Sequence, residues 1–209
     1  YRIYGGLRFY ERLEIKNAIA YLRVVFNNND NPSFERSISN PTRGVGEKTL
    51  GKIRQAAKKY NISYIKASAK LIDEGLISGR GGAGLRDYLE FIAGCKGFIE
   101  ENTLSELMEL IIKETGLYAY HAKEAGEKGK TRTENLEELI TATKNFEQSI
   151  KDERTNIEIA ESYLDIISLD SGDRQASEYD DAAQLMTMHS AKGLGFKLVL
   201  LTGLEESLF

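Results

Sequence analysis

The stretch GVGEKT, residues 44–49, contains the glycines, lysine and threonine from which phosphate-binding loops are built. A nucleotide-hydrolysing P-loop follows a buried strand and needs a glycine directly before its lysine. Here Glu47 separates Gly46 from Lys48, and no buried-strand pattern precedes Gly44. The spacing therefore argues against a nucleotide-hydrolysing loop in this segment.

The longer stretch NPTRGVGEKTLGKIRQAAKKY, residues 40–60, fits a helix, a tight Gly-x-Gly turn and a second helix. Glycine permits the sharp turn, and the first amides of the second helix have no partner within the helix. A DNA phosphate could bind those amides, with Arg43, Lys48 and Lys52 adding positive charge, a contact that positions a protein without reading sequence. The same pattern also fits a turn that serves only packing, and both interpretations stay open.

Charge is distributed unevenly along a chain of 209 residues whose net charge is -4. Residues 36–66 hold eight basic residues against one acidic residue, a net charge of +7. Residues 134–181 hold fourteen acidic residues against four basic ones, a net charge of -10. A polyanion would bind near the first segment and avoid the second, although both runs also fit solvated helix faces.

Hydrophobic periodicity predicts a largely helical chain with strand patterns at its two ends. Helices are expected at about residues 9–26, 32–39, 47–60, 63–74, 84–100, 103–115, 133–150 and 155–168, and strands within 1–6, 184–189 and 196–203. The glycine-rich stretches 78–84 and 126–132 predict loops between helices, and residues 169–181 a polar linker. This order indicates a helical domain inserted into a loop of an α/β domain.

Other residue types capable of chemistry are sparse. The single cysteine, Cys95, lies in a helical pattern and is expected in the core. The two histidines, His121 and His189, have no spaced Cys, Asp or Glu set around them, so we expect no metal site. No apolar run approaches the roughly 18 residues of a membrane span, so we expect no membrane partner and a cytoplasmic protein.

Three stretches resemble one family: YRIYGGLRFYERLEIKNAIAYLR at the start, NPTRGVGEKTL in the helical block, and QLMTMHSAKGLGFKLVLLTGLEESLF at the end. They are similar to the UvrD/Rep/PcrA group of superfamily 1 DNA helicases. The resemblance implies a mainly α chain in which a helical 2B domain is inserted into an incomplete RecA-like α/β domain of the P-loop NTPase type, called 2A. Residues 1–24 would be a first piece of 2A, residues 25–181 the 2B domain, and residues 182–209 the returning piece of 2A.

The resemblance also implies where DNA and nucleotide bind. TRGVG is similar to the family's GIG hairpin, which contacts the phosphates of duplex DNA, and the last stretch is similar to motif V. The implied DNA-binding residues are Thr42, Arg43, Gly44, Val45, Gly46, Lys48, Thr49, Lys52, Thr187 and His189, and the implied nucleotide-binding residues are Lys192, Gly193 and Gly195.

By the same resemblance, the parent protein would be an ATP-dependent helicase that moves 3′ to 5′ and acts in DNA repair or replication. It would use ATP and Mg2+, bind DNA at the junction of single strand and duplex, and meet repair-protein partners. The Walker motifs of the family are not in this sequence, so we expect no catalytic residue and no ATP hydrolysis in this chain alone. Its 2B part would bind duplex DNA and regulate unwinding.

Position 195 departs from the family pattern HSAKGLEF, because this chain has Gly195 where the family has a glutamate that bonds the ATP ribose. A lost hydrogen bond to a charged group is worth roughly 1.5 to 3 kcal/mol. We therefore expect weaker ATP binding in a full-length protein with Gly195.

An alternative function belongs to a different class: a helical module that binds protein partners and uses its basic hairpin for packing alone. Salt dependence separates the two functions. Phosphate contacts lower affinity steeply as salt rises, whereas an apolar protein interface responds far less.

Overall fold

A computed structural model of the chain describes residues 2–4, 9–151, 153–171, 184–186, 195 and 198–200. The chain divides into two compact units. One, which we call the helical unit, comprises Arg8–Asp173. The other, the strand unit, comprises Tyr1–Leu7 together with Arg174–Phe209. Each unit is described by itself below.

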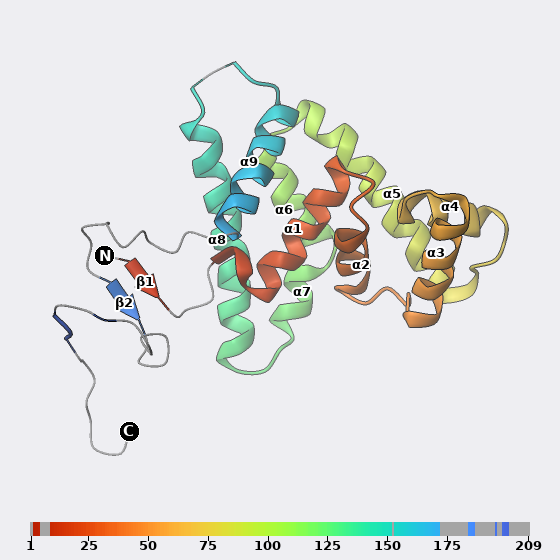
Figure 1. Ribbon diagram of the computed structural model, residues 1–209, viewed down its shortest axis with the longest axis horizontal. Helices are drawn as coiled ribbons and strands as arrows, with labels where there is room; N and C mark the ends of the chain where they lie inside the picture. The colour runs from red at the N-terminus through yellow and green to blue at the C-terminus, as the bar shows by residue number, and fades with distance from the viewer. Residues whose placement is uncertain are drawn as a thin grey trace. The chain divides into compact units, whose positions relative to one another are not determined.

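The helical unit contains a short 3-10 helix followed by a series of α-helices (Figure 1). Their bounds are η1 Phe9–Glu11, α1 Leu13–Phe26, α2 Asn31–Ser39, α3 Glu47–Tyr60, α4 Tyr64–Asp73, α5 Gly79–Glu101, α6 Leu104–Glu114, α7 Leu117–Ala122, α8 Glu127–Ser149 and α9 Asn156–Ser171. The expectation of a mainly α chain is confirmed over the described residues. None of the described helices is both long enough and apolar enough to cross a membrane.

Side-chain caps explain why several helices begin where the sequence placed them. Asp30 accepts a hydrogen bond from the Ser33 amide at the start of α2. At α6, Thr103 and Glu106 form a reciprocal capping box, in which each side chain accepts from the other residue's amide. These contacts satisfy amides that have no partner inside the helix.

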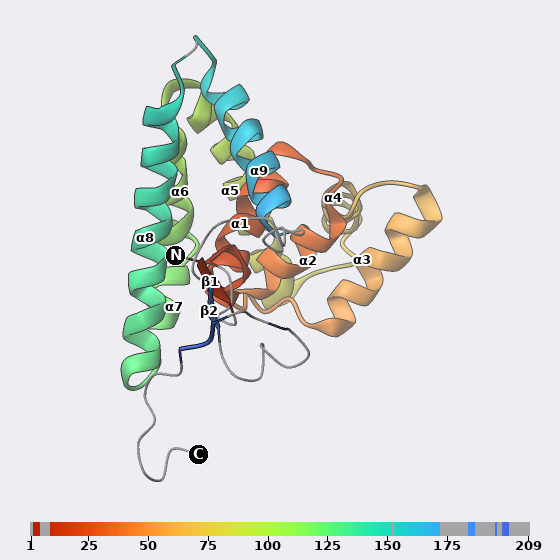
Figure 2. The same cartoon turned by 60° about the vertical axis from the view of Figure 1, so that its left-hand side comes forward.

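Helix α1 lies at the centre of the helical unit and packs against α2, α5, α6 and α8 (Figure 2). It is buried around most of its circumference, with Ile15, Tyr21 and Leu22 wholly inaccessible to solvent. Such burial is typical of a core helix, and α1 buries two polar residues, Glu14 and Asn17, along with its apolar side chains. Cys95 of α5 is also buried, with 1% of its surface exposed, as the sequence predicted.

The domain boundary expected from the sequence after residue 24 stays a prediction. In the structure, α1 packs within the helical unit, which begins at Arg8. The physical reason is the burial of α1, which supplies the helical unit with much of its apolar core.

Two loops expected from glycine content are helical. Residues 78–84 and 126–132 were predicted as loops, but α5 begins at Gly79 and α8 at Glu127. A further helix, α7, was not predicted. In each glycine-rich stretch only the glycine at the turn, Gly79 or Gly126, has a positive φ. The others lie in helix, because tertiary contacts outweigh the low helix propensity of glycine.

Among its described residues, the strand unit contains two short strands, β1 Arg2–Tyr4 and β2 Gln184–Met186. They pair in parallel, with Ile3 opposite Leu185. Strands far apart in the sequence thus lie side by side.

Candidate nucleic-acid interface

The connection between α2 and α3 forms a tight turn over residues 42–46, which we call the hairpin. Gly44 has a φ of +75°, in the left-handed region that favours glycine. Gly46 is the N-cap of α3 and has no side chain with which to cap it. The start of α3 therefore has no side-chain cap, and Gly46, Glu47 and Lys48 are exposed there, an arrangement that suits an anion at a helix start.

The start of α5 packs against the hairpin backbone. A Cβ atom at Gly84 would overlap the carbonyl oxygen of Arg43, and one at Gly81 would lie 2.9 Å from that of Gly44. Two glycines three residues apart thus present a flat helix face to which the hairpin comes close. This role of the two glycines was not predicted from the sequence, although the Gly-x-x-Gly spacing is a signal for close backbone approach.

The side chain of Arg43 is partly buried on the inner side of the hairpin. Its guanidinium donates hydrogen bonds to the hydroxyl of Tyr21 and to the carbonyl oxygens of Pro41 and Thr115, at 2.6, 2.9 and 3.0 Å. The same group lies 5.4 Å from the ring centroid of Tyr21 and 5.9 Å from that of Tyr88. The charged end of Arg43 therefore faces the protein, and its expected contact with DNA stays a prediction.

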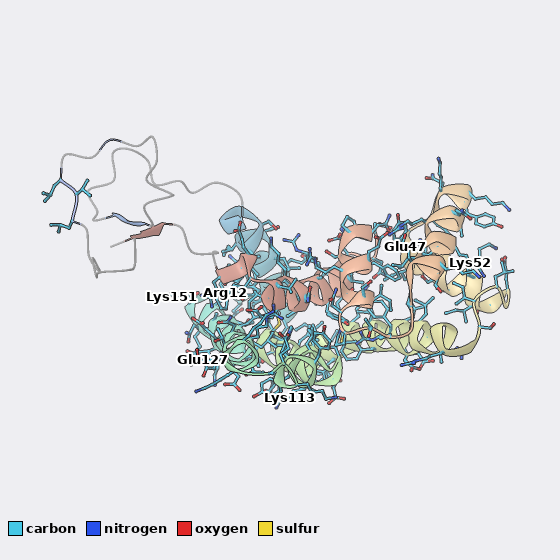
Figure 3. All side chains as sticks on the ribbon, turned by 90° about the horizontal axis from the view of Figure 1, so that it is seen from below. Arg12, Glu47, Lys52, Lys113, Glu127 and Lys151 are labelled. Atoms are coloured by element: carbon cyan, nitrogen blue, oxygen red, sulfur yellow. The ribbon has the colours of Figure 1, made fainter. Side chains whose placement is uncertain are left out.

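Exposed cations surround the hairpin and continue along α3 and α4. Lys48 and Lys52 of α3 and Arg80 of α5 are exposed, and Lys52 donates a hydrogen bond to the Leu76 carbonyl oxygen at 2.8 Å. Figure 3 shows Lys52 and Glu47 extending from α3, far along the helical unit from Glu127 and Lys151. The exposed residues Lys58, Lys59 and Lys66 extend the basic surface. The surface formed by α3, α4 and the start of α5 therefore carries several exposed cations.

The other expected hairpin residues divide between surface and core. Thr42 is exposed and Thr49 partly buried, whereas Val45 is buried and belongs to the apolar core. The Val45 side chain thus attaches the turn to the apolar core. It is shielded from solvent, whereas Gly44 and Gly46 on either side of it are exposed.

An ion pair fixes α3 to α2. The Arg54 guanidinium donates to both carboxylate oxygens of Glu35, at 2.6 and 2.7 Å, and also pairs with Glu47. Hydrogen bonding from Arg54 lowers the pKa of Glu35 below its ordinary value. The pairing of Glu47 reduces the repulsion that its carboxylate would exert on an anion at the start of α3.

The remaining expected site residues belong to the strand unit. Thr187, His189, Lys192 and Gly193 lie outside the described residues, so their roles remain predictions. Gly195 is exposed, and open space surrounds the position that a Cβ atom would take.

Metal-binding geometry does not occur among the described residues, where no cluster of three or more His, Cys, Asp or Glu is placed to hold an ion. His121 is buried, and its Nδ1 lies 2.6 Å from a carboxylate oxygen of Glu124. Arg132 donates to the same oxygen at 2.5 Å. This group joins α7 to α8 and has a structural role.

Comparison with known proteins identifies the family. The UvrD-like helicase C-terminal domain matches residues 1–74 and 92–209, which is most of the chain. The chain belongs to this family. It is 42% identical over its whole length to DNA helicase II of Escherichia coli K12 and 36% identical to the ATP-dependent DNA helicase PcrA of Bacillus subtilis. The chain covers 29% of the first protein and 28% of the second.

The contact between the hairpin and α5 predicts opposite effects for two glycine substitutions in the same helix. Gly84→Ala should lower the free energy of unfolding by about 1 to 3 kcal/mol, because the added methyl group overlaps the Arg43 carbonyl oxygen. Gly94→Ala should raise it by about 0.5 to 1 kcal/mol, because its position is exposed with no neighbour within 4 Å. Urea denaturation of the two variants beside the unmodified chain measures both changes. Equal effects of the two substitutions would contradict the close contact at Gly84.

Proposed function

We propose that this chain is part of an ATP-dependent DNA helicase and that its helical unit binds the phosphates of duplex DNA through the hairpin. The observation that carries the proposal is the uncapped start of α3, preceded by the left-handed turn at Gly44 and flanked by exposed Lys48, Lys52 and Arg80. Backbone amides and cations that converge on one point suit a phosphate. The names of the relatives, DNA helicase II and ATP-dependent DNA helicase PcrA, support the same class of ligand.

Binding of this kind fixes the protein on the duplex without reading bases. Amides at a helix start and lysine side chains contact phosphate oxygens, which are the same at every base pair. The hairpin would therefore hold duplex DNA of any sequence, as a helicase requires. In the whole protein, the helical unit would correspond to the 2B domain and regulate unwinding as the motor moves 3′ to 5′.

The strand unit supports the proposed position of the helical unit as an insertion. Parallel neighbours in a sheet need a long connection between them, and the helical unit lies between β1 and β2 in the sequence. We infer that the two strands belong to one RecA-like sheet, the 2A domain, which the rest of a longer protein would complete.

In that longer protein, ATP and Mg2+ would supply the energy for movement. Lys192, Gly193 and Gly195 would face the nucleotide, while the groups that hydrolyse it would come from other parts of the protein. This chain alone should therefore hydrolyse no ATP. DNA is the partner that we propose first, with repair proteins as further partners of the whole protein in the cytoplasm.

The first test is the salt dependence of DNA binding. Fluorescence anisotropy of a labelled DNA hairpin with a 3′ tail should give a log-log slope near -3 for the 209-residue chain, which corresponds to three or four phosphate contacts. Lys48→Ala should make the slope less steep by about 0.9, because one contact is lost. Lys151→Ala removes the same charge far from the hairpin (Figure 3) and should leave the slope unchanged.

Two results would contradict this function. Equal slopes for Lys48→Ala and Lys151→Ala would place DNA away from the hairpin. The absence of DNA binding at low salt would favour the alternative, a helical module that binds protein partners.

The second test concerns position 195 in a full-length protein. Gly195→Glu should lower the Michaelis constant for ATP by about tenfold or more, because one hydrogen bond to a charged group is restored. Steady-state ATPase assays with saturating single-stranded DNA measure the constant, and Gly195→Gln is the control for side-chain size without charge. An unchanged Michaelis constant in Gly195→Glu would refute a role of this position in nucleotide binding.

A further inference from the structure

We propose that Arg43 is a positioning residue, which holds the hairpin in its DNA-binding shape from within and does not itself contact a phosphate. The predicted effect on DNA binding rests on the proposed function. The contacts made by the Arg43 guanidinium do not depend on that function.

The acceptors of the Arg43 guanidinium come from three separate segments. Tyr21 lies on α1, Pro41 lies in the turn after α2, and Thr115 follows the last turn of α6. One rigid, planar group thus connects the hairpin to α1, to the end of α6 and to the residue that precedes the hairpin in the chain. Arginine suits this task because its donors have a fixed fork geometry.

The surroundings of the guanidinium are aromatic and neutral. Tyr21 and Tyr88 are 0% and 1% exposed, and burial raises the pKa of both hydroxyls, so neither is ionised at neutral pH. The Tyr21 hydroxyl donates to the Asn40 carbonyl oxygen at 2.9 Å, and the Tyr88 hydroxyl lies 2.6 Å from that of Ser37. Each ring therefore has a hydrogen bond of its own in addition to its contact with Arg43.

Contacts within the protein use three of the five N–H donors of Arg43 and place its guanidinium beside two aromatic rings. Turning the guanidinium outward to a phosphate would break these contacts. The Arg43 backbone carbonyl oxygen is also held against Gly84, where no Cβ atom could fit. Lys48, Lys52 and Arg80 are exposed beside the hairpin and can reach a phosphate without such a cost.

Conservative substitutions separate positioning from direct contact. Arg43→Lys keeps the positive charge but removes the planar fork. Tyr21→Phe removes one acceptor from a side chain that is inaccessible to any ligand. Tyr163→Phe is the matched control, because Tyr163 is also buried and hydrogen-bonded but lies on α9, where its hydroxyl accepts from Thr143.

Two measurements are made on each variant of the 209-residue chain. The first is affinity for a labelled DNA hairpin at several salt concentrations. The second, without DNA, is hydrogen–deuterium exchange of the peptide that covers residues 42–50. Circular dichroism verifies that each variant keeps its helices.

Positioning predicts that Arg43→Lys binds DNA about tenfold more weakly with an unchanged salt slope, because an ordering interaction is lost while the charge remains. Tyr21→Phe should weaken binding about threefold or more, and Tyr163→Phe less than about twofold. Exchange at residues 42–50 should accelerate in the first two variants alone. If Arg43→Lys does not fold, Tyr21→Phe carries the test.

Direct contact predicts the opposite pattern and would overturn the proposal. Arg43→Lys and Tyr21→Phe would then bind like the unmodified chain, and exchange at the hairpin would not change. If the unmodified chain binds no DNA, the proposed function fails, whereas the exchange measurement still decides whether Arg43 orders the hairpin.

Discussion

The close contact between the Arg43 carbonyl oxygen and Gly84 is the constraint on which the rest of the candidate interface depends. It requires a helix face without side chains, which the glycines at the start of α5 provide. The Arg43 side chain secures the same segment from the other side through Tyr21 and Thr115. A turn of five residues is therefore held by contacts from α1, α5 and the end of α6.

Electrostatics complement this rigidity. The chain as a whole is acidic, yet residues 36–66 carry a net charge of +7, and most of their lysines are exposed. The strongly acidic residues 134–181 follow later in the chain and contribute much of α8 and α9. In salt solutions where charges more than about 10 Å apart are largely screened from each other, distant charges contribute little to binding. The charge near the binding site, and not the net charge of the protein, therefore determines where a polyanion binds. An acidic protein can thus present a basic binding site.

The sequence predicted the features that depend on neighbours along the chain. The helices from α1 to α4 and α6 follow from apolar periodicity and from caps such as Asp30 and Thr103. The glycine-rich start of α5 was predicted as a loop, because only its contact with the hairpin shows why glycines occur inside a helix. The inward direction of Arg43 could not be predicted either. It depends on Tyr21 and Tyr88, which lie far from it in sequence and meet it only in the fold.

The measurement that tests the central claim most directly is hydrogen–deuterium exchange of the 209-residue chain with and without excess blunt duplex DNA. If the uncapped start of α3 binds a phosphate, exchange should slow in the peptides that cover residues 42–52 and the start of α5. The acidic helices α8 and α9 should exchange at the same rate in both samples. Protection confined to α8 and α9, or none at the hairpin under conditions where the duplex is bound, would contradict the account.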